Sequence, residues 1–374
     1  MRKFDASQRV CLLDAVSASG LMSCASSSLL FQKIALFLKL NDYTVVKRPS
    51  HADILIFNTC GITDAFAKIN NNYINQFVKA PKKVIVFGCL CKVSEDIRKS
   101  GHILIPPGSI HQFSDYFDYR VRIEDVSASM CTVSYVGKKA LRPLLIAQGC
   151  LNKCSYCNIK IAKGALQSRC QKDILEDIKR FIKEKSFEVM LIADDCGCWG
   201  HDSGANIVEL VDEILRIDKR IKIGLFNFYP SLFLKYYPFL KKHILDKRIT
   251  YLLTPLQSGS SRILKLMKRS YSLSLMMKTI KEIKAYNSKI RLESHFIINF
   301  PTETMEDFKK CLHLARFFDN VDFVEYQDNR LTEASQIFPK CPGNQALLKK
   351  DLFMLYQKKG LLKGKFYLSF SRQK

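Results

Sequence analysis

The chain alternates short apolar runs with longer stretches of helical periodicity, and this alternation limits the possible folds more than any other feature. In the first hundred residues, apolar runs at 9–16, 53–57 (DILIF) and 83–87 (KVIVF) are separated by helix-like patterns at 29–40 and 63–78. Short apolar runs are typical of strands buried on both faces, and strands that alternate with helices pair in parallel. We therefore expect an open parallel α/β sheet in the N-terminal region.

A second and longer series of the same kind begins near residue 141. Its six strand candidates, separated by helical stretches, lie at 141–146, 188–193, 222–228, 250–253, 291–298 and 322–326. Six successive β/α units predict a partial (β/α)6 barrel with its reactive side chains at the carboxyl ends of the strands. The expected domains are an α/β domain at 1–136, the barrel at 137–340 and a basic tail at 341–374, with the junction near Gly137.

Three cysteines of the N-terminal region lie where its strands end. Cys60 and Cys89 follow the second and third apolar runs within three residues, and Cys24 precedes the first helix. Ligands of open α/β sheets bind beyond the carboxyl ends of the strands, so these thiols should meet there and form a metal site. Cys11 is a rival to Cys24, but it lies inside the first apolar run, where cysteines more often pack in the core.

A C-x3-C-x2-C motif, formed by Cys150, Cys154 and Cys157, follows the first strand of the second series. Three thiolates this close can bind three irons of a cubane cluster and leave the fourth iron open to another ligand. A structural zinc site needs a fourth Cys or His, and the nearest downstream candidate, Cys170, is poorly spaced. The motif therefore favours an iron–sulfur cluster over zinc.

The segment at 148–169 (QGCLNKCSYCNIKIAKGALQSR) resembles the radical S-adenosylmethionine (SAM) enzymes, and specifically their methylthiotransferase branch. Further segments resemble that branch in the same order, namely 58–60 with 88–89, 254–260 (TPLQSGS), 267–271, 296–308 (FIINFPTETMEDF) and 326–334. The resemblance covers about residues 9–334.

The resemblance implies that the cysteines of the motif hold a 4Fe-4S cluster whose open iron chelates SAM. One electron from the cluster would cleave SAM to a 5′-deoxyadenosyl radical, which abstracts hydrogen from an unactivated carbon. It also implies that Cys24, Cys60 and Cys89 hold a second 4Fe-4S cluster that donates sulfur, and that a second SAM supplies the methyl group. A flavodoxin or ferredoxin would supply the electrons.

Further cofactor contacts are implied for residues of the matching segments, namely Tyr156, Asp194, Asp195, Gln257, Ser258 and Asn299. For the two aspartates, helix capping is an equal alternative. Two departures from the family pattern lie in the fifth-strand turn, where Asn299 and Thr302 replace the usual glycines.

The charge of the chain bears on its substrate. Lys and Arg number 59 against 35 Asp and Glu, a net charge of +24, which favours a polyanionic partner and nucleic acid over a membrane surface. No apolar run approaches the roughly 18 residues of a membrane span, and 14 cysteines in a chain of this size suit a reducing compartment. We expect a cytoplasmic monomer without membrane contact that acts on a modified adenosine next to the anticodon of tRNA.

Two alternatives remain open at this point. The first is methylthiolation of a protein or peptide, as in the ribosomal-protein branch of the family. The second is a nucleic-acid-binding protein with a cluster and no catalysis. The tRNA-acting relatives usually end in a small β-barrel of about 50 residues, and too few residues follow Ala334 for one, so the basic tail is expected to serve as an RNA arm.

Overall fold

A computed structural model describes residues 3–15, 24–61, 63–78, 82–126 and 141–367. Its N-terminal lobe contains a parallel sheet in the order β1-β2-β3-β4. The strands are β1 (Val10–Asp14), β2 (Ile54–Thr59), β3 (Lys83–Gly88) and β4 (Ile103–Ile105). The helices of this lobe are α2 (Ala25–Leu40), α3 (Asp64–Phe77), α4 (Leu90–Val93), α5 (Glu95–Arg98) and α6 (Phe113–Tyr116). The open parallel sheet is thus confirmed, and β4 is an addition from a region whose sequence is less regular.

The second sheet has seven parallel strands in the order β13-β12-β11-β10-β9-β8-β5. Its strands are β5 (Arg142–Leu145), β8 (Glu188–Ile192), β9 (Lys222–Phe226), β10 (Ile249–Leu253), β11 (Arg291–Ile298), β12 (Asn320–Glu325) and β13 (Gly364–Tyr367). All six predicted strands of the partial barrel are present.

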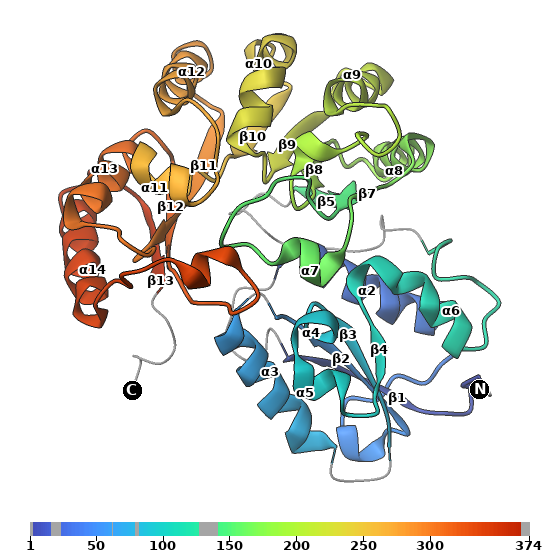
Figure 1. Ribbon diagram of the computed structural model, residues 1–374. Helices are drawn as coiled ribbons and strands as arrows, with labels where there is room; N and C mark the ends of the chain where they lie inside the picture. Colours follow the sequence, from blue (N-terminus) through green and yellow to red (C-terminus); the bar gives the residue numbers. More distant parts are fainter. Residues whose placement is uncertain (1–2, 16–23, 62, 79–81, 127–140, 368–374) are drawn as a thin grey trace.

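Helices cover the outer side of this curved sheet (Figure 1). In chain order they are α8 (Gln171–Lys183), α9 (Ile207–Ile217), α10 (Pro230–Leu245), α12 (Leu273–Tyr286), α13 (Met305–Ala315) and α14 (Gly343–Lys358). Shorter elements follow two of the strands. After β5 come α7 (Ile159–Lys163) and the antiparallel pair of β6 (Ala147–Gln148) with β7 (Gln167–Ser168), and after β10 comes α11 (Ser261–Leu266).

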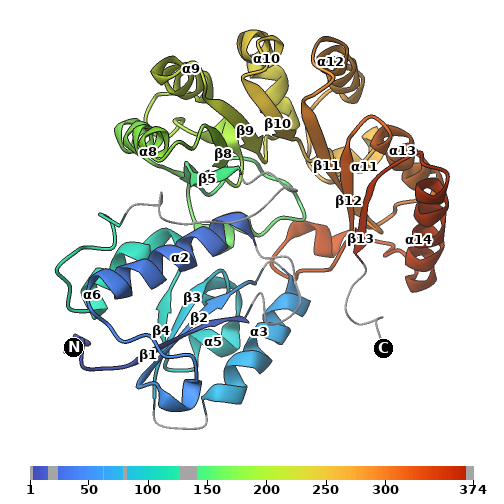
Figure 2. The same ribbon diagram turned by 180° about the vertical axis from the view of Figure 1, so that it is seen from behind.

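The expectation of a separate basic tail after residue 340 is wrong for the residues that the structure describes. α14 covers the edge of the barrel, and β13 pairs with β12, so this segment supplies a seventh strand (Figure 2). The apolar side chains of the segment explain the difference, because Phe353 is buried and Phe366 stacks on Phe323 with ring centroids 6.0 Å apart. Of the lysines that suggested a free arm, Lys350 and Lys358 are exposed on α14, whereas Lys349 is buried.

One of the hydrophobic clusters spans both lobes. Buried residues of α2, such as Leu30 and Phe37, belong to the same cluster as Met190, Tyr251 and Leu253 of the barrel strands. α2 accordingly lies on the side of the small sheet that faces the barrel (Figures 1 and 2). The predicted junction near Gly137 falls outside the described residues. Among the helices that are described, none has both the length and the hydrophobicity to cross a membrane.

Candidate functional site

The loop that carries Cys150, Cys154 and Cys157, called here the barrel triplet, is held at its start and near its middle. Gly149 has φ +78°, and a Cβ there would lie 2.6 Å from the carbonyl oxygen of Ala165, so only glycine allows this approach. Within the loop, the backbone N–H of Ser155 donates to the Met267 carbonyl at 3.0 Å. The loop is therefore set before any ligand binds.

Arg269 is the buried cation of the barrel triplet. It is 5% exposed and donates to Cys154 Sγ at 3.5 Å and to the Tyr156 hydroxyl at 3.2 Å. Burial opposes its charge, but the neighbouring tyrosines and Cys154 outweigh burial and raise its pKa, so it stays a cation. The sequence favours a solvated helix face for Arg269, and this expectation is wrong, because the chain turns inward after α11.

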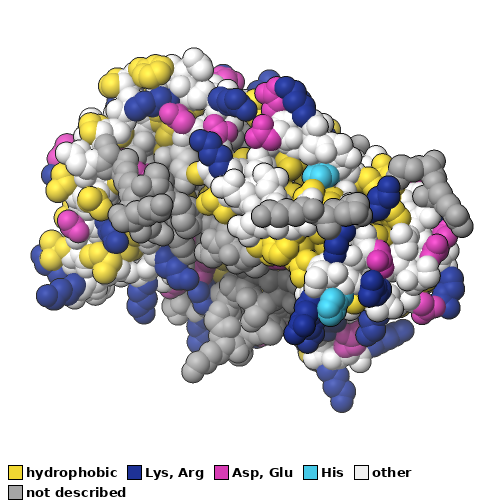
Figure 3. Space-filling view, turned by 90° about the horizontal axis from the view of Figure 1, so that it is seen from below, with side chains coloured by type: hydrophobic (Ala, Val, Ile, Leu, Met, Phe, Trp, Pro, Cys, Tyr) yellow, Lys and Arg dark blue, Asp and Glu magenta, His cyan; other side chains and the backbone are white. Residues whose placement is uncertain are grey.

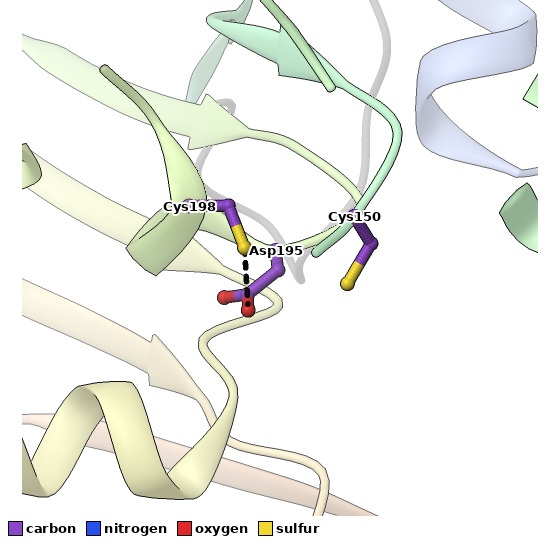
Figure 4. A group of neighbouring side chains, drawn as sticks. All are labelled: Cys150, Asp195 and Cys198. Carbon is purple, nitrogen blue, oxygen red and sulfur yellow. Dashed lines mark hydrogen bonds between the residues drawn. The ribbon is translucent and has the colours of Figure 1, made fainter. Parts of the chain in front are cut away.

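Cys198 lies beside the barrel triplet. Its thiol donates to Asp195 Oδ2 at 3.2 Å, and single ligand atoms of Cys150, Asp195 and Cys198 all lie within 4.8 Å of one another (Figure 4). The sequence favours a packing role for Cys198 because no partner stands nearby in the chain; the partner stands 48 residues upstream, at the end of a neighbouring strand.

Asp195 is a hub of hydrogen bonds. Its carboxylate accepts from the backbone N–H of Gly197 and of Tyr229, each at 3.0 Å, and from Asn152 Nδ2 at 2.8 Å. The contact with Gly197 caps the short 3-10 helix Cys196–Cys198. Of the two roles open for Asp195 in the sequence, capping is the one present here.

Cys24, Cys60 and Cys89, called here the N-terminal triplet, lie near one another at the carboxyl end of the small sheet. Cys60 and Cys89 directly follow β2 and β3, and Cys24 precedes α2. Burial raises the pKa of Cys89, and the nearby Cys60 and Cys24 raise it further. Cys11 lies in the core of the lobe, with its thiol 3.8 Å from the Lys47 carbonyl, so Cys24 is the better candidate for the first ligand.

Gly88 explains how Cys89 reaches the carboxyl end of the small sheet. Its φ is +117°, and a Cβ there would lie 2.2 Å from the carbonyl oxygen of Thr59. Glycine alone permits this turn at the end of β3.

The residues predicted to contact the cofactor differ in the partners that their side chains already have. Tyr156 lies next to Arg269, and the buried Gln257 Oε1 has no hydrogen-bond partner within the described part of the chain. Ser258, by contrast, accepts from the Ser260 N–H at 3.1 Å and faces Cys311 of α13, so its hydroxyl is used in packing. Asp194 forms an ion pair with Lys163.

The turn after β11 has the left-handed backbone that glycine favours, although other residues stand where the family usually has glycine. Asn299 has φ 56° and Thr302 has φ 68°. Lys349 of α14, which is 0% exposed, donates to Asn299 Oδ1 at 2.8 Å and to Glu303 Oε2 at 2.6 Å, and the Asn299 N–H donates to the same carboxylate oxygen at 2.6 Å. Asn299 is among the few residue types that tolerate a left-handed backbone, and this ion pair holds it there.

The residues present fit an iron–sulfur cluster with SAM at the barrel triplet. The donors are three thiols, and burial raises the pKa of Cys157 to about 12, so the free thiol stays protonated until a metal displaces the proton. The orphaned Gln257 Oε1 offers a hydrogen-bond acceptor to a ligand in the same region of the barrel. Fold and site together define a radical SAM enzyme.

Comparison with known proteins agrees. The sequence matches the Radical SAM superfamily over residues 144–315 and the Uncharacterized protein family UPF0004 over residues 21–103. It is 30% identical over 342 residues to a probable threonylcarbamoyladenosine tRNA methylthiotransferase of Pyrococcus abyssi, an alignment that covers 86% of this chain and 78% of the relative. It is 27% identical to the ribosomal protein uS12 methylthiotransferase RimO of Cronobacter sakazakii, with coverage of 90% and 80%. The chain belongs to the radical SAM methylthiotransferase family and is an enzyme of that class.

Solved structures support the fold. The radical SAM methyltransferase TsrM from Kitasatospora setae superposes with a TM-score of 0.60 at 12% identity, covering 88% of this chain and 77% of that one. At such low identity the likeness concerns the fold alone. Family membership implies a 4Fe-4S cluster and SAM as cofactors.

Proposed function

We propose that this enzyme holds two 4Fe-4S clusters, one at each cysteine triplet, and that it methylthiolates a modified adenosine of tRNA. The observation that supports the proposal is the contact, across the lobe interface, between the segments that follow the two triplets. α4, which follows Cys89, contacts α7, which follows Cys157. The Asn158 side chain donates to the Gly61 carbonyl at 2.9 Å, so the loops after Cys157 and Cys60 touch directly.

When bound, a cluster with SAM at the barrel triplet supplies one-electron cleavage of a carbon–sulfur bond, and a cluster at the N-terminal triplet supplies sulfur. The chain's own residues bind and orient. Arg269 holds Cys154 and Tyr156 in place through its hydrogen bonds to both. The turn at Asn299 offers its backbone at the carboxyl end of β11, and the shared core under α2 keeps water from the base of the barrel.

The same proposal assigns the N-terminal triplet to a domain at 1–136 and the barrel triplet to a domain that begins at 137. It includes a flavodoxin or ferredoxin as electron donor and a monomeric enzyme that works in the cytoplasm, where thiols stay reduced.

Two observations favour tRNA as the substrate. The relative from Pyrococcus abyssi, at 30% identity, is named for threonylcarbamoyladenosine tRNA. The net charge of +24 suits a phosphate backbone, since lysines and arginines release counterions when they bind it. Lys and Arg side chains are spread over the face in Figure 3 rather than gathered in one patch, which suits a broad contact with a folded RNA.

The test is nucleoside mass spectrometry of tRNA from cells that lack the protein and from cells complemented with it. The methylthio derivative of the modified adenosine should appear with the wild-type chain and be absent with Cys150→Ala. If tRNA from the deletion strain carries unchanged methylthio-adenosine, tRNA is not the substrate.

A ribosomal protein is the second candidate, and the 27% identity to a uS12 methylthiotransferase is the observation that favours it. Intact-mass analysis of ribosomal proteins from the same two strains separates the candidates. A methylthio mass increase on a ribosomal protein, with tRNA unchanged, would transfer the proposal to this substrate.

A further inference from the structure

A buried lysine lies between the two triplets. Lys163 ends α7, and its side chain is 4% exposed. Its ammonium donates to Asp194 Oδ1 at 2.6 Å and to Ser26 Oγ at 2.8 Å. Burying an ammonium costs free energy unless it is paired and hydrogen-bonded, so this position is specified by its partners.

The partners of Lys163 reach both triplets. Ser26, in the first turn of α2, has its Oγ 3.1 Å from Cys24 Sγ. The second carboxylate oxygen of Asp194 accepts from the N–H of Gly149 at 2.8 Å, and Gly149 precedes Cys150. A continuous polar path of side chains therefore connects the N-terminal triplet to the loop that carries the barrel triplet.

The two charges of the path act on different neighbours. Burial lowers the pKa of Lys163, but Asp194, Cys24 and Cys89 outweigh burial and raise it, so Lys163 remains a cation. Lys163 in turn favours the thiolate of Cys89 against the effect of burial. Asp194 disfavours the thiolate of Cys157 as well as that of Cys89. The positive charge of Lys163 thus acts on the N-terminal triplet, whereas the negative charge of Asp194 acts on cysteines of both triplets.

We propose that Lys163 is a positioning residue that joins the two cysteine triplets into one unit. Its charge stabilises an anionic cluster at the N-terminal triplet, and its ion pair with Asp194 fixes the loop that precedes Cys150. This inference rests on the proposed function, because it requires a cluster at the N-terminal triplet. A nearby cation favours the reduced cluster, since reduction adds negative charge.

The test compares Lys163→Met, Lys163→Arg and wild type, each reconstituted anaerobically. The readout is the oxidised-to-reduced ratio of each cluster, followed by electron paramagnetic resonance during a redox titration. In Lys163→Met the ratio at the N-terminal triplet should move about tenfold toward the oxidised form at a fixed potential, a shift that corresponds to a modest loss of charge stabilisation. Lys163→Arg should restore most of it, and Lys179→Met, which changes an exposed lysine on α8, should leave it unchanged.

The other outcomes also decide. Loss of the N-terminal cluster alone in Lys163→Met, with rescue by Lys163→Arg, supports the inference. If Lys163→Met does not fold, Lys163→Met/Asp194→Asn is compared with Asp194→Asn, because the double variant leaves no unpaired buried charge. Two loaded clusters with unchanged ratios would overturn the inference and leave the proposed function intact. Wild-type protein that loads one cluster would instead overturn the proposed function.

Discussion

Replacing Lys349 by methionine tests whether α14 holds the turn that follows β11. The Lys349 and Glu303 side chains are both 0% exposed and meet at 2.6 Å. Removing one partner of such a pair leaves the other charge buried and uncompensated, which costs about 3–5 kcal/mol. In Lys349→Met, the Asn299 N–H would remain as a hydrogen-bond donor to the Glu303 carboxylate, but no cation would face it within the described part of the chain. We therefore expect Lys349→Met to lose free energy of unfolding in the upper part of this range.

Urea unfolding measures the loss, with Trp199 as the probe. Trp199 is the single tryptophan of the chain and lies buried in the barrel core, so its fluorescence reports on the barrel. Lys350→Met, which changes the exposed neighbour on α14, is the matched control. The double variant Lys349→Met/Glu303→Gln should recover most of the lost free energy of unfolding, because neither charge remains.

The loss in Lys349→Met should also depend on pH. Burial raises the pKa of Glu303, and without Lys349 the pKa rises further. A carboxyl group whose folded-state pKa is raised contributes its full stability below the unfolded-state pKa of about 4.3 and loses it as pH rises through the folded-state pKa. The deficit of Lys349→Met should therefore be larger at about pH 8 than at about pH 5. A free energy of unfolding within about 0.5 kcal/mol of wild type at both pH values would refute the role given to Lys349.

Three further predictions concern the cysteine sites. Gly88→Ala should lower the iron content to about four per chain, because the added Cβ meets the Thr59 carbonyl oxygen and moves Cys89. Iron analysis with Gly101→Ala as the control checks this prediction, and full iron content in Gly88→Ala would contradict it. Arg269→Met should weaken SAM binding about tenfold or more in calorimetric titrations, since it removes the cation beside Cys154 and Tyr156; unchanged affinity would refute the positioning role. Cys198→Ala should shift the reduction potential of the barrel cluster while Cys198→Ser should not, because the side chain of Cys198 lies close to the Cys150 sulfur and its hydrogen bond to Asp195 holds it there. Equal potentials in redox titrations would argue against this role.

Much of the fold could be predicted from the sequence, because buried parallel strands leave short apolar runs. All six strands predicted for the barrel are present, as are the strands that precede Cys60 and Cys89. The packing of the C-terminal segment on the barrel was harder to predict. Its lysines dominate the composition, whereas Phe353 and Phe366, which attach it to the barrel, carry no periodic pattern strong enough to outweigh them.

The candidate site could be predicted only where its residues lie close in sequence. The spacing of Cys150, Cys154 and Cys157 is visible in the sequence, but the approach of Cys198 to Cys150 depends on two strands lying side by side. Lys163 lies in the segment that resembles the family, but neither it nor Lys349 carries a sequence signal of burial in a chain with 59 basic residues. Only the packing of α7 and α14 shows that both are buried and paired.

The central claim is that each cysteine triplet holds a 4Fe-4S cluster. The measurement that tests it most directly is the iron and sulfide content of anaerobically purified protein, wild type beside a variant with Cys24, Cys60 and Cys89 all changed to alanine. Two clusters predict about eight irons per wild-type chain and about four per variant chain. About four irons in both proteins would contradict the claim and remove the sulfur-donating site from the N-terminal triplet.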